Sequence, residues 1–208
     1  MAISRLLLIS VLGLTLASAC GSDDALDSDE AARRLYLGLD GSIEDSLNLG
    51  FDGYNAASSA NIDPQTAPGL DTGTLTITGQ VDKGNSTNKE MRLHVGMVEF
   101  SDGVLTIPTA DGNDTLTIDL TYDTSTTQAD QPYLHLSLRN VPTGDFTGEL
   151  TGLYHVSGDL AGDVTLNLTM AGTLADGGNG TVIRAVGSTT ITGTATSGDG
   201  VYTVNLTR

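Results

Sequence analysis

Hydrophobic and polar residues alternate along most of the chain after Gly73. The alternation is clearest at 74–78, 115–122, 133–139 and 164–170, where many of the polar positions are threonines. A period of two residues is typical of antiparallel strands with one packed face and one solvated face. Weaker alternation predicts further strands at 91–100, 103–107, 146–156, 181–196 and 201–207.

The phase of this alternation predicts which side chains form the core. Thr115, Thr117 and Thr165 fall on the solvated face. The residues expected to face inward are Leu116, Ile118, Leu120, Leu134, Leu136, Leu138, Val164, Leu166 and Leu168. Asp-Gly pairs such as Asp102-Gly103 and Asp199-Gly200 stand between strands and favour the positive φ of tight hairpins.

A different period precedes the strands and predicts a helix over 28–49. Leu35, Leu39, Ile43 and Leu47 recur every four residues and therefore share one helix face. Ser28 is suited to cap the helix N-terminus. Glycines at 38, 41 and 50 weaken a helix, so we expect them to mark close packing against a sheet.

Together the two patterns predict one mainly β domain over 28–208. Residues 28–68 are expected to form the N-terminal helix and a connector that ends in a loop, and residues 69–208 the β-domain. The fold class is an antiparallel β-sandwich, or a strongly bent sheet that forms a partial barrel, with one N-terminal amphipathic helix. The helix could either fill the core or cover a cavity.

The first residues have the pattern of an export signal. Arg5 precedes an aliphatic run from Leu6 to Leu16, which is too short to span a bilayer, and small residues follow at 17–19 before Cys20. This stretch resembles the bacterial lipoprotein precursors, in which a lipobox cysteine receives a diacylglycerol and becomes the first residue. Leu16 lies one position further from the cysteine than is usual in that family.

The resemblance implies that residues 1–19 are a signal peptide, that Cys20 is lipidated and that 20–27 is a tether. Cys20 is the only cysteine, so it has no disulfide partner within the chain. Gly21, rather than Asp, implies sorting to the outer membrane, with the periplasmic or surface side left open. The small residues at 17–19 also suit ordinary signal peptidase, which would release a protein with a free N-terminal thiol.

The net charge of the chain argues against nucleic acids and anionic bilayers as partners of the domain. It carries 9 basic and 26 acidic residues and a formal net charge of −17. Nucleic acids require a positive surface, so we expect no nucleic-acid partner. An anionic bilayer would likewise repel the domain, which leaves the N-terminal lipid as its contact with the membrane. Solubility accounts for such a charge, and we expect a monomer.

Few residues in the sequence suggest a metal-binding or catalytic site. His94, His135 and His155 lie in predicted strands and would bind a metal only if those strands were neighbours. Asp111, Asn113 and Asp114 are the best candidates for calcium, although a turn already explains them. Nucleophile-elbow, zinc-protease and phosphate-loop motifs are absent from the sequence. We therefore predict no enzyme, no catalytic residue, no metal site and no cofactor, and the ligand-binding residues are unknown.

These observations favour a lipid-anchored protein of the cell envelope that acts as a non-catalytic structural or recognition module. One alternative is a carrier that holds an apolar ligand between a curved sheet and the N-terminal helix. Another alternative is an extracytoplasmic hydrolase. A cavity beneath the helix would distinguish the carrier from the module.

Overall fold

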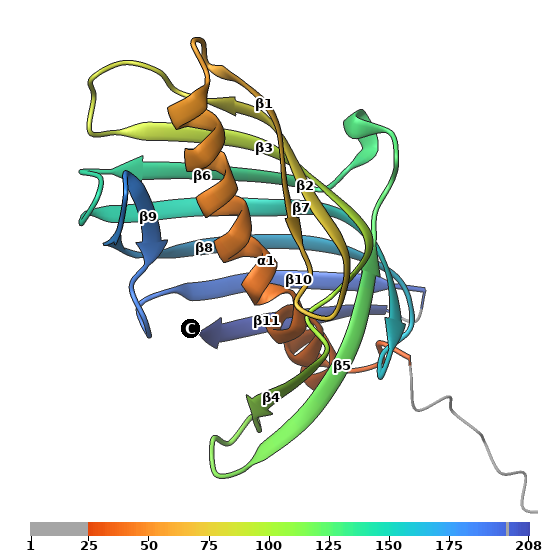
Figure 1. The fold of residues 1–208 in the computed structure, drawn as a ribbon. Helices are drawn as coiled ribbons and strands as arrows, with labels where there is room; N and C mark the ends of the chain where they lie inside the picture. Colours follow the sequence, from red (N-terminus) through yellow and green to blue (C-terminus); the bar gives the residue numbers. More distant parts are fainter. Residues whose placement is uncertain (1–24, 199) are drawn as a thin grey trace, which may run out of the picture.

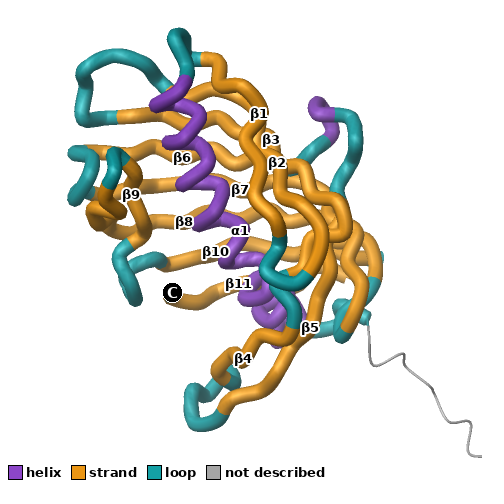
Figure 2. Tube along the Cα trace, viewed as in Figure 1, coloured by secondary structure: helices purple, strands orange, loops and turns teal. Residues whose placement is uncertain are grey.

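A computed structural model describes residues 25–198 and 200–208 and shows a sheet curled around one α-helix (Figures 1 and 2). Eleven strands of these residues form one antiparallel sheet in which β1 and β11 are the two ends of the main strand order. The sheet, as described, does not close into a barrel. The mainly β class and the strongly bent sheet with one N-terminal helix are thus confirmed.

The sheet follows the order β1-β2-β3-β5-β7-β8-β10-β11. Three further strands lie off this path: β4 pairs with β5, β6 pairs with both β3 and β7, and β9 pairs with β8. A short 3-10 helix, Gln128–Asp130, lies between β5 and β6. The strands are β1 Asn61–Pro68, β2 Thr72–Val81, β3 Lys89–Ser101, β4 Val104–Pro108, β5 Thr115–Asp123, β6 Tyr133–Arg139, β7 Asp145–Gly158, β8 Gly162–Gly178, β9 Thr181–Arg184, β10 Thr190–Ser197 and β11 Gly200–Thr207.

The helix α1 spans Asp29–Ala56 and lies along the concave face of the sheet (Figure 1). It begins where the sequence predicts, since the Ser28 hydroxyl accepts a hydrogen bond from the Ala31 amide at 3.2 Å. It ends seven residues later than the predicted end at 49. At this end the Lys83 ammonium donates to the carbonyl of Tyr54 and so meets the negative end of the helix dipole.

The predicted apolar stripe of α1 is the centre of the core. Leu35, Leu39, Ile43 and Leu47 are at most 2 % exposed. Each such burial contributes about 1.5–3 kcal/mol relative to an exposed side chain. A Cβ at position 38 would lie 2.6 Å from the Tyr122 hydroxyl, so the absence of a side chain there allows the helix to approach β5.

The predicted strand phase is confirmed with one partial exception. The three threonines expected on the solvated face are exposed, and the predicted inward residues are buried except Leu116. Leu116 is half-buried because the first part of β5 pairs only with β4, in a hairpin that extends away from the rest of the sheet (Figure 1).

Three further predicted boundaries differ from the structure. The connector contains strand β1, in which Pro64 and Pro68 are tolerated because a strand at the sheet edge needs fewer backbone donors. The predicted strand 181–196 is two strands, β9 and β10, separated by a loop. The predicted tether 20–27 overlaps the fold, because Ala25 forms a bridge with Ala161 and Leu26 is buried. No α-helix within the described ranges is sufficiently long and apolar to span a membrane.

Candidate functional site

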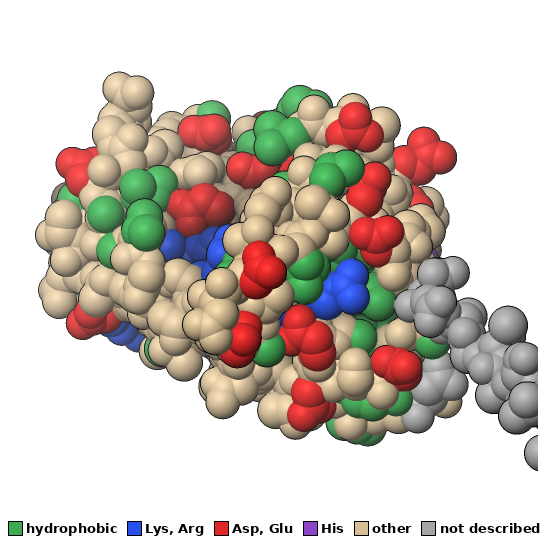
Figure 3. Space-filling view, turned by 90° about the horizontal axis from the view of Figure 1, so that it is seen from below, with side chains coloured by type: hydrophobic (Ala, Val, Ile, Leu, Met, Phe, Trp, Pro, Cys, Tyr) green, Lys and Arg blue, Asp and Glu red, His purple; other side chains and the backbone are tan. Residues whose placement is uncertain are grey.

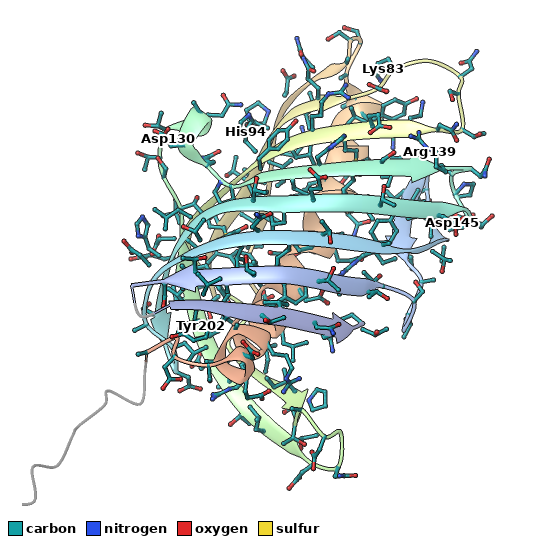
Figure 4. The ribbon with its side chains drawn as sticks, turned by 180° about the vertical axis from the view of Figure 1, so that it is seen from behind. Lys83, His94, Asp130, Arg139, Asp145 and Tyr202 are labelled. Atoms are coloured by element: carbon teal, nitrogen blue, oxygen red, sulfur yellow. The ribbon has the colours of Figure 1, made fainter. Side chains whose placement is uncertain are left out.

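The face of the sheet turned away from α1, here called the outer face, carries polar side chains in rows across the strands (Figure 4). Because side chains alternate along each strand, residues paired across strands point to the same side. The pairing registers define a central row that runs from β2 to β10 through β3, β6, β7 and β8. This central row consists of Gln80, Arg92, His135, Glu149, Thr169 and Thr192.

The first hollow on the outer face has a volume of about 500 Å³ and lies over β1, β2, β3 and β6. Figure 4 shows its His94 on the outer side of the sheet, near the 3-10 segment that carries Asp130. The polar side chains that line the hollow include Asn61, Thr78, Gln80, Arg92, His94, Gln128 and Tyr133. We call it the His94 hollow.

Hydrogen bonds hold the walls of the His94 hollow in place. The Gln128 amide nitrogen donates to the Thr78 hydroxyl at 2.7 Å, which fixes the 3-10 segment over β2. The Gln80 amide nitrogen donates to Asn61 Oδ1 at 2.8 Å and joins β2 to β1. Each bond uses only part of the hydrogen-bonding capacity of an amide group, so donors and acceptors remain for a ligand.

An imidazole and a phenol ring lie side by side at the base of the same hollow. The rings of His94 and Tyr133 meet edge to face, with centroids 5.4 Å apart. His94 Nδ1 is buried and has no hydrogen-bond partner within the described part of the chain. Beside them, Arg92 Nη2 lies 2.7 Å from Asp82 Oδ1 in a half-exposed ion pair. The base of the hollow therefore combines aromatic surface with a neutralised cation.

A second hollow of about 360 Å³ lies further along the central row, over β6, β7, β8 and β10. His135, Glu149, Thr169 and Thr192 of the central row line it. The small side chain of Ala171 on the neighbouring row leaves space beside them. We call it the Glu149 hollow. The Glu149 carboxylate forms no hydrogen bond or ion pair with the described residues.

Glu90 organises the polar side chains between the two hollows and the end of β6. Its carboxylate accepts hydrogen bonds from Ser137 at 2.8 Å and Arg139 at 2.9 Å, and contacts His135 Nε2 at 2.9 Å. Partial burial raises the pKa of Glu90, but these three contacts outweigh it and hold the pKa below its ordinary value. In a serine triad the histidine lies between the serine and the acid. Here Glu90 binds both residues, so this cluster does not activate Ser137 as a nucleophile.

A third hollow, of about 490 Å³, lies beside α1 and is also lined by β9, by the loop that follows it and by Arg208. Its floor is charged: Arg184 Nη1 lies 2.9 Å from Asp40 Oδ1, and Arg184 Nε lies 2.8 Å from Glu44 Oε2. Arg208 adds a contact of 3.2 Å to the other oxygen of Asp40. Figure 3 views the molecule from below and shows basic side chains recessed among acidic and hydrophobic ones.

Burial and ion pairing shift the pKa values of Asp40 and Arg184 in opposite directions. Burial raises the pKa of Asp40, but the hydrogen bonds from Arg184 and Tyr36 and the nearby Arg208 hold it below its ordinary value. Burial lowers the pKa of Arg184, and the two carboxylates raise it above its ordinary value. Asp40 and Arg184 are therefore both charged in the folded protein.

The sequence did not predict this ion cluster. Asp40 and Glu44 lie outside the predicted apolar stripe of the helix, yet Asp40 is buried. The partner residue Arg184 is 144 positions away along the chain, and no local pattern connects the two. The alternation of polar residues did predict the outer face, but the rows depend on strand registers that the pattern does not contain.

The three histidines considered as metal ligands do not converge on one point in the structure. His94 and His135 lie on adjacent strands, whereas His155 lies near the end of β7 with Nδ1 2.6 Å from Asp163. Across residues 25–198 and 200–208, no three His, Cys, Asp or Glu side chains are grouped as metal ligands.

The predicted calcium candidates form the turn of the β4–β5 hairpin. Asp111 accepts hydrogen bonds from the Thr109 hydroxyl and from the amide groups of Asn113, and these bonds lower the pKa of Asp111 to about 2. Asp114 accepts from the Thr115 amide. Cys20, the predicted lipid attachment site, lies outside the described residues. No protein-family model matches the chain, and no similar characterised protein or solved structure was found.

Proposed function

We propose that the chain is a lipid-anchored protein of the bacterial cell envelope. Its folded domain acts as a non-catalytic module that recognises a partner on the outer face of the sheet. The lipid on Cys20 holds it at the membrane, and the excess of acidic over basic residues disfavours binding of nucleic acid. Support for the anchor is the resemblance of residues 16–21 to a lipobox.

The observation that carries the recognition role is the polar outer face, where two hollows lie along one row of side chains paired across the strands. The leucine and isoleucine stripe of α1 is packed against the sheet, and the hollow beside the helix combines an ion cluster with the apolar side chains of Ile183, Ala185 and Val186. A carrier of an apolar ligand needs an apolar cavity at that place. Because the stripe fills the space between the helix and the sheet, and the neighbouring hollow contains an ion cluster, we favour a module that binds through the central row over a carrier.

Membrane fractionation of cells that express the full chain tests the anchor. We expect the wild-type protein in the outer-membrane fraction and the Cys20→Ser variant in the soluble fraction, because the lipid is the only attachment proposed. Gly21→Asp is the matched control: it leaves the lipidated cysteine in place, and we expect the inner membrane to retain it. A wild-type protein in the soluble fraction would contradict the proposal.

A further inference from the structure

We propose that the central row binds a linear, electrically neutral oligosaccharide that occupies both the His94 hollow and the Glu149 hollow. This inference rests on the proposed recognition role and names the class of ligand. It depends on the continuity of the two hollows, the side chains that line them, and the balance of charge along the row.

The two hollows form one continuous binding surface. Arg92 lines the His94 hollow, His135 lines the Glu149 hollow, and these two residues are paired directly across β3 and β6. The central row crosses six strands, and neighbouring strands lie about 4.8 Å apart, so the row is about 24 Å long. A surface of this length suits an extended chain of several sugar units better than one small molecule.

The side chains of the His94 hollow match both surfaces of a sugar ring. Gln80 and Gln128 present planar amide groups that can donate to one hydroxyl and accept from the next. Tyr133 and Pro64 provide apolar surface for the carbon–hydrogen face of the ring. The His94 ring, whose buried Nδ1 has no hydrogen-bond partner among the described residues, adds aromatic surface beside Tyr133.

The Glu149 hollow adds groups of the same kind. The Glu149 carboxylate has no partner among the described residues and can accept two hydroxyl hydrogens. The Thr169 and Thr192 hydroxyls, 3.0 Å apart, continue the row toward β10. Hydroxyl and carboxylate groups so arranged bind polyhydroxylated ligands without requiring a charge on the ligand.

The balance of charge excludes anionic ligands from this surface. Arg92 is paired with Asp82 and Arg139 with Glu90, so each of these two cations already has an anionic partner. The chain as a whole carries a net charge of −17. Polyuronates, phosphorylated glycans and nucleic acids would therefore be repelled.

An extended peptide is a poorer match for the same surface. Peptides commonly add a strand to a sheet edge and hydrogen-bond to its backbone. The edge nearest the His94 hollow is β1, where Pro64 lacks a donor and the register with β2 shifts between Ile62 and Gln65. These features obstruct strand addition, whereas side-chain recognition of a sugar does not depend on the edge.

The test measures binding of the purified full chain to neutral oligosaccharides of glucose, mannose and N-acetylglucosamine, each from one to six units long. Polygalacturonate fragments and a pool of neutral peptides serve as the competing ligand classes. The variants are Gln80→Ala in the first hollow and Thr169→Tyr, which fills the second. Thr165→Tyr is the matched control, since it places the same side chain on the outer face of the same strand but outside both hollows.

We expect at least one neutral series to bind, with affinity that rises with chain length. Gln80→Ala and Thr169→Tyr should each weaken the longest ligand about tenfold, the effect of one or two lost hydrogen bonds, and Thr165→Tyr should not. Binding only of uronates or peptides, no binding of any series, or equal loss from Thr165→Tyr would overturn the inference. Fractionation tests the membrane anchor separately, so a failed anchor and a failed ligand class are distinguishable.

Discussion

Replacing Arg184 should destabilise the protein strongly, because this side chain joins α1 to the end of the sheet. Its guanidinium contacts Asp40 and Glu44 through separate nitrogens and donates a third bond, of 3.1 Å, to the Asp40 carbonyl. The side chains of Arg184 and Asp40 are only 10 % and 9 % exposed. In Arg184→Ala, water would solvate the remaining carboxylates poorly.

The expected loss of stability in Arg184→Ala depends on the contacts that the buried Asp40 carboxylate keeps. Removing one partner of a buried ion pair typically costs about 3–5 kcal/mol because the other charge stays buried. Tyr36 still donates to Asp40 at 2.9 Å, and Arg208 still lies beside it, so we expect the lower end, about 3 kcal/mol. Arg184→Lys keeps the charge but cannot reproduce the planar fork, and should lose about half as much.

Urea unfolding followed by circular dichroism measures this difference. With a slope of about 2 kcal/mol per molar urea, the Arg184→Ala midpoint should fall by about 1.5 M. Arg139→Ala is the matched control, because Arg139 is 50 % exposed and should cost less than about 1 kcal/mol. If Arg184→Ala lowers the free energy of unfolding no more than Arg139→Ala does, solvent screens the ion cluster and the predicted stabilisation by Arg184 is wrong.

Three further predictions follow from the same packing. Because the pKa of Asp40 is depressed in the folded state, its carboxylate stabilises the protein above pH about 3.9, its unfolded value, and that contribution is lost as pH falls through the folded pKa. The urea-midpoint difference between wild type and Asp40→Asn should therefore be constant from pH 5 to 7 and shrink below about pH 4. Gly38→Ala should destabilise by about 1–3 kcal/mol in the same assay, despite the better helix propensity of alanine, because the new Cβ would meet the Tyr122 hydroxyl; an unchanged midpoint would contradict this. A fragment that begins at Gly69 should aggregate or melt without cooperativity in calorimetry, since it lacks α1 and the edge strand β1, and a cooperative transition would show that both elements are dispensable.

The alternation of side chains was sufficient to predict the sheet, because a strand with one packed face and one solvated face has a local period of two. The alternation did not predict one edge strand and one boundary between strands. β1 escaped prediction because Pro64 and Pro68 resemble loop residues unless the strand is known to lie at an edge. The boundary between β9 and β10 was missed because the loop that separates them contains Val186 and Thr189, residue types that favour strands.

The sites were harder to predict than the fold because they depend on contacts between distant residues. The sequence placed His135 on a polar face but could not pair it with Arg92, which only the β3–β6 register brings about. It placed Asp40 on a helix but could not bury it against Arg184. Spacing along the chain therefore predicts the face on which a residue lies, whereas strand register and tertiary packing determine its neighbours.

Mass spectrometry of the N-terminal peptide of the mature protein, purified from the membranes of bacteria that express the full chain, tests the central claim most directly. The account predicts that the chain begins at Cys20 and that this residue carries a diacylglycerol, with or without a further acyl chain. A mature chain that begins at Cys20 with an unmodified thiol would contradict the membrane anchor and indicate a secreted protein.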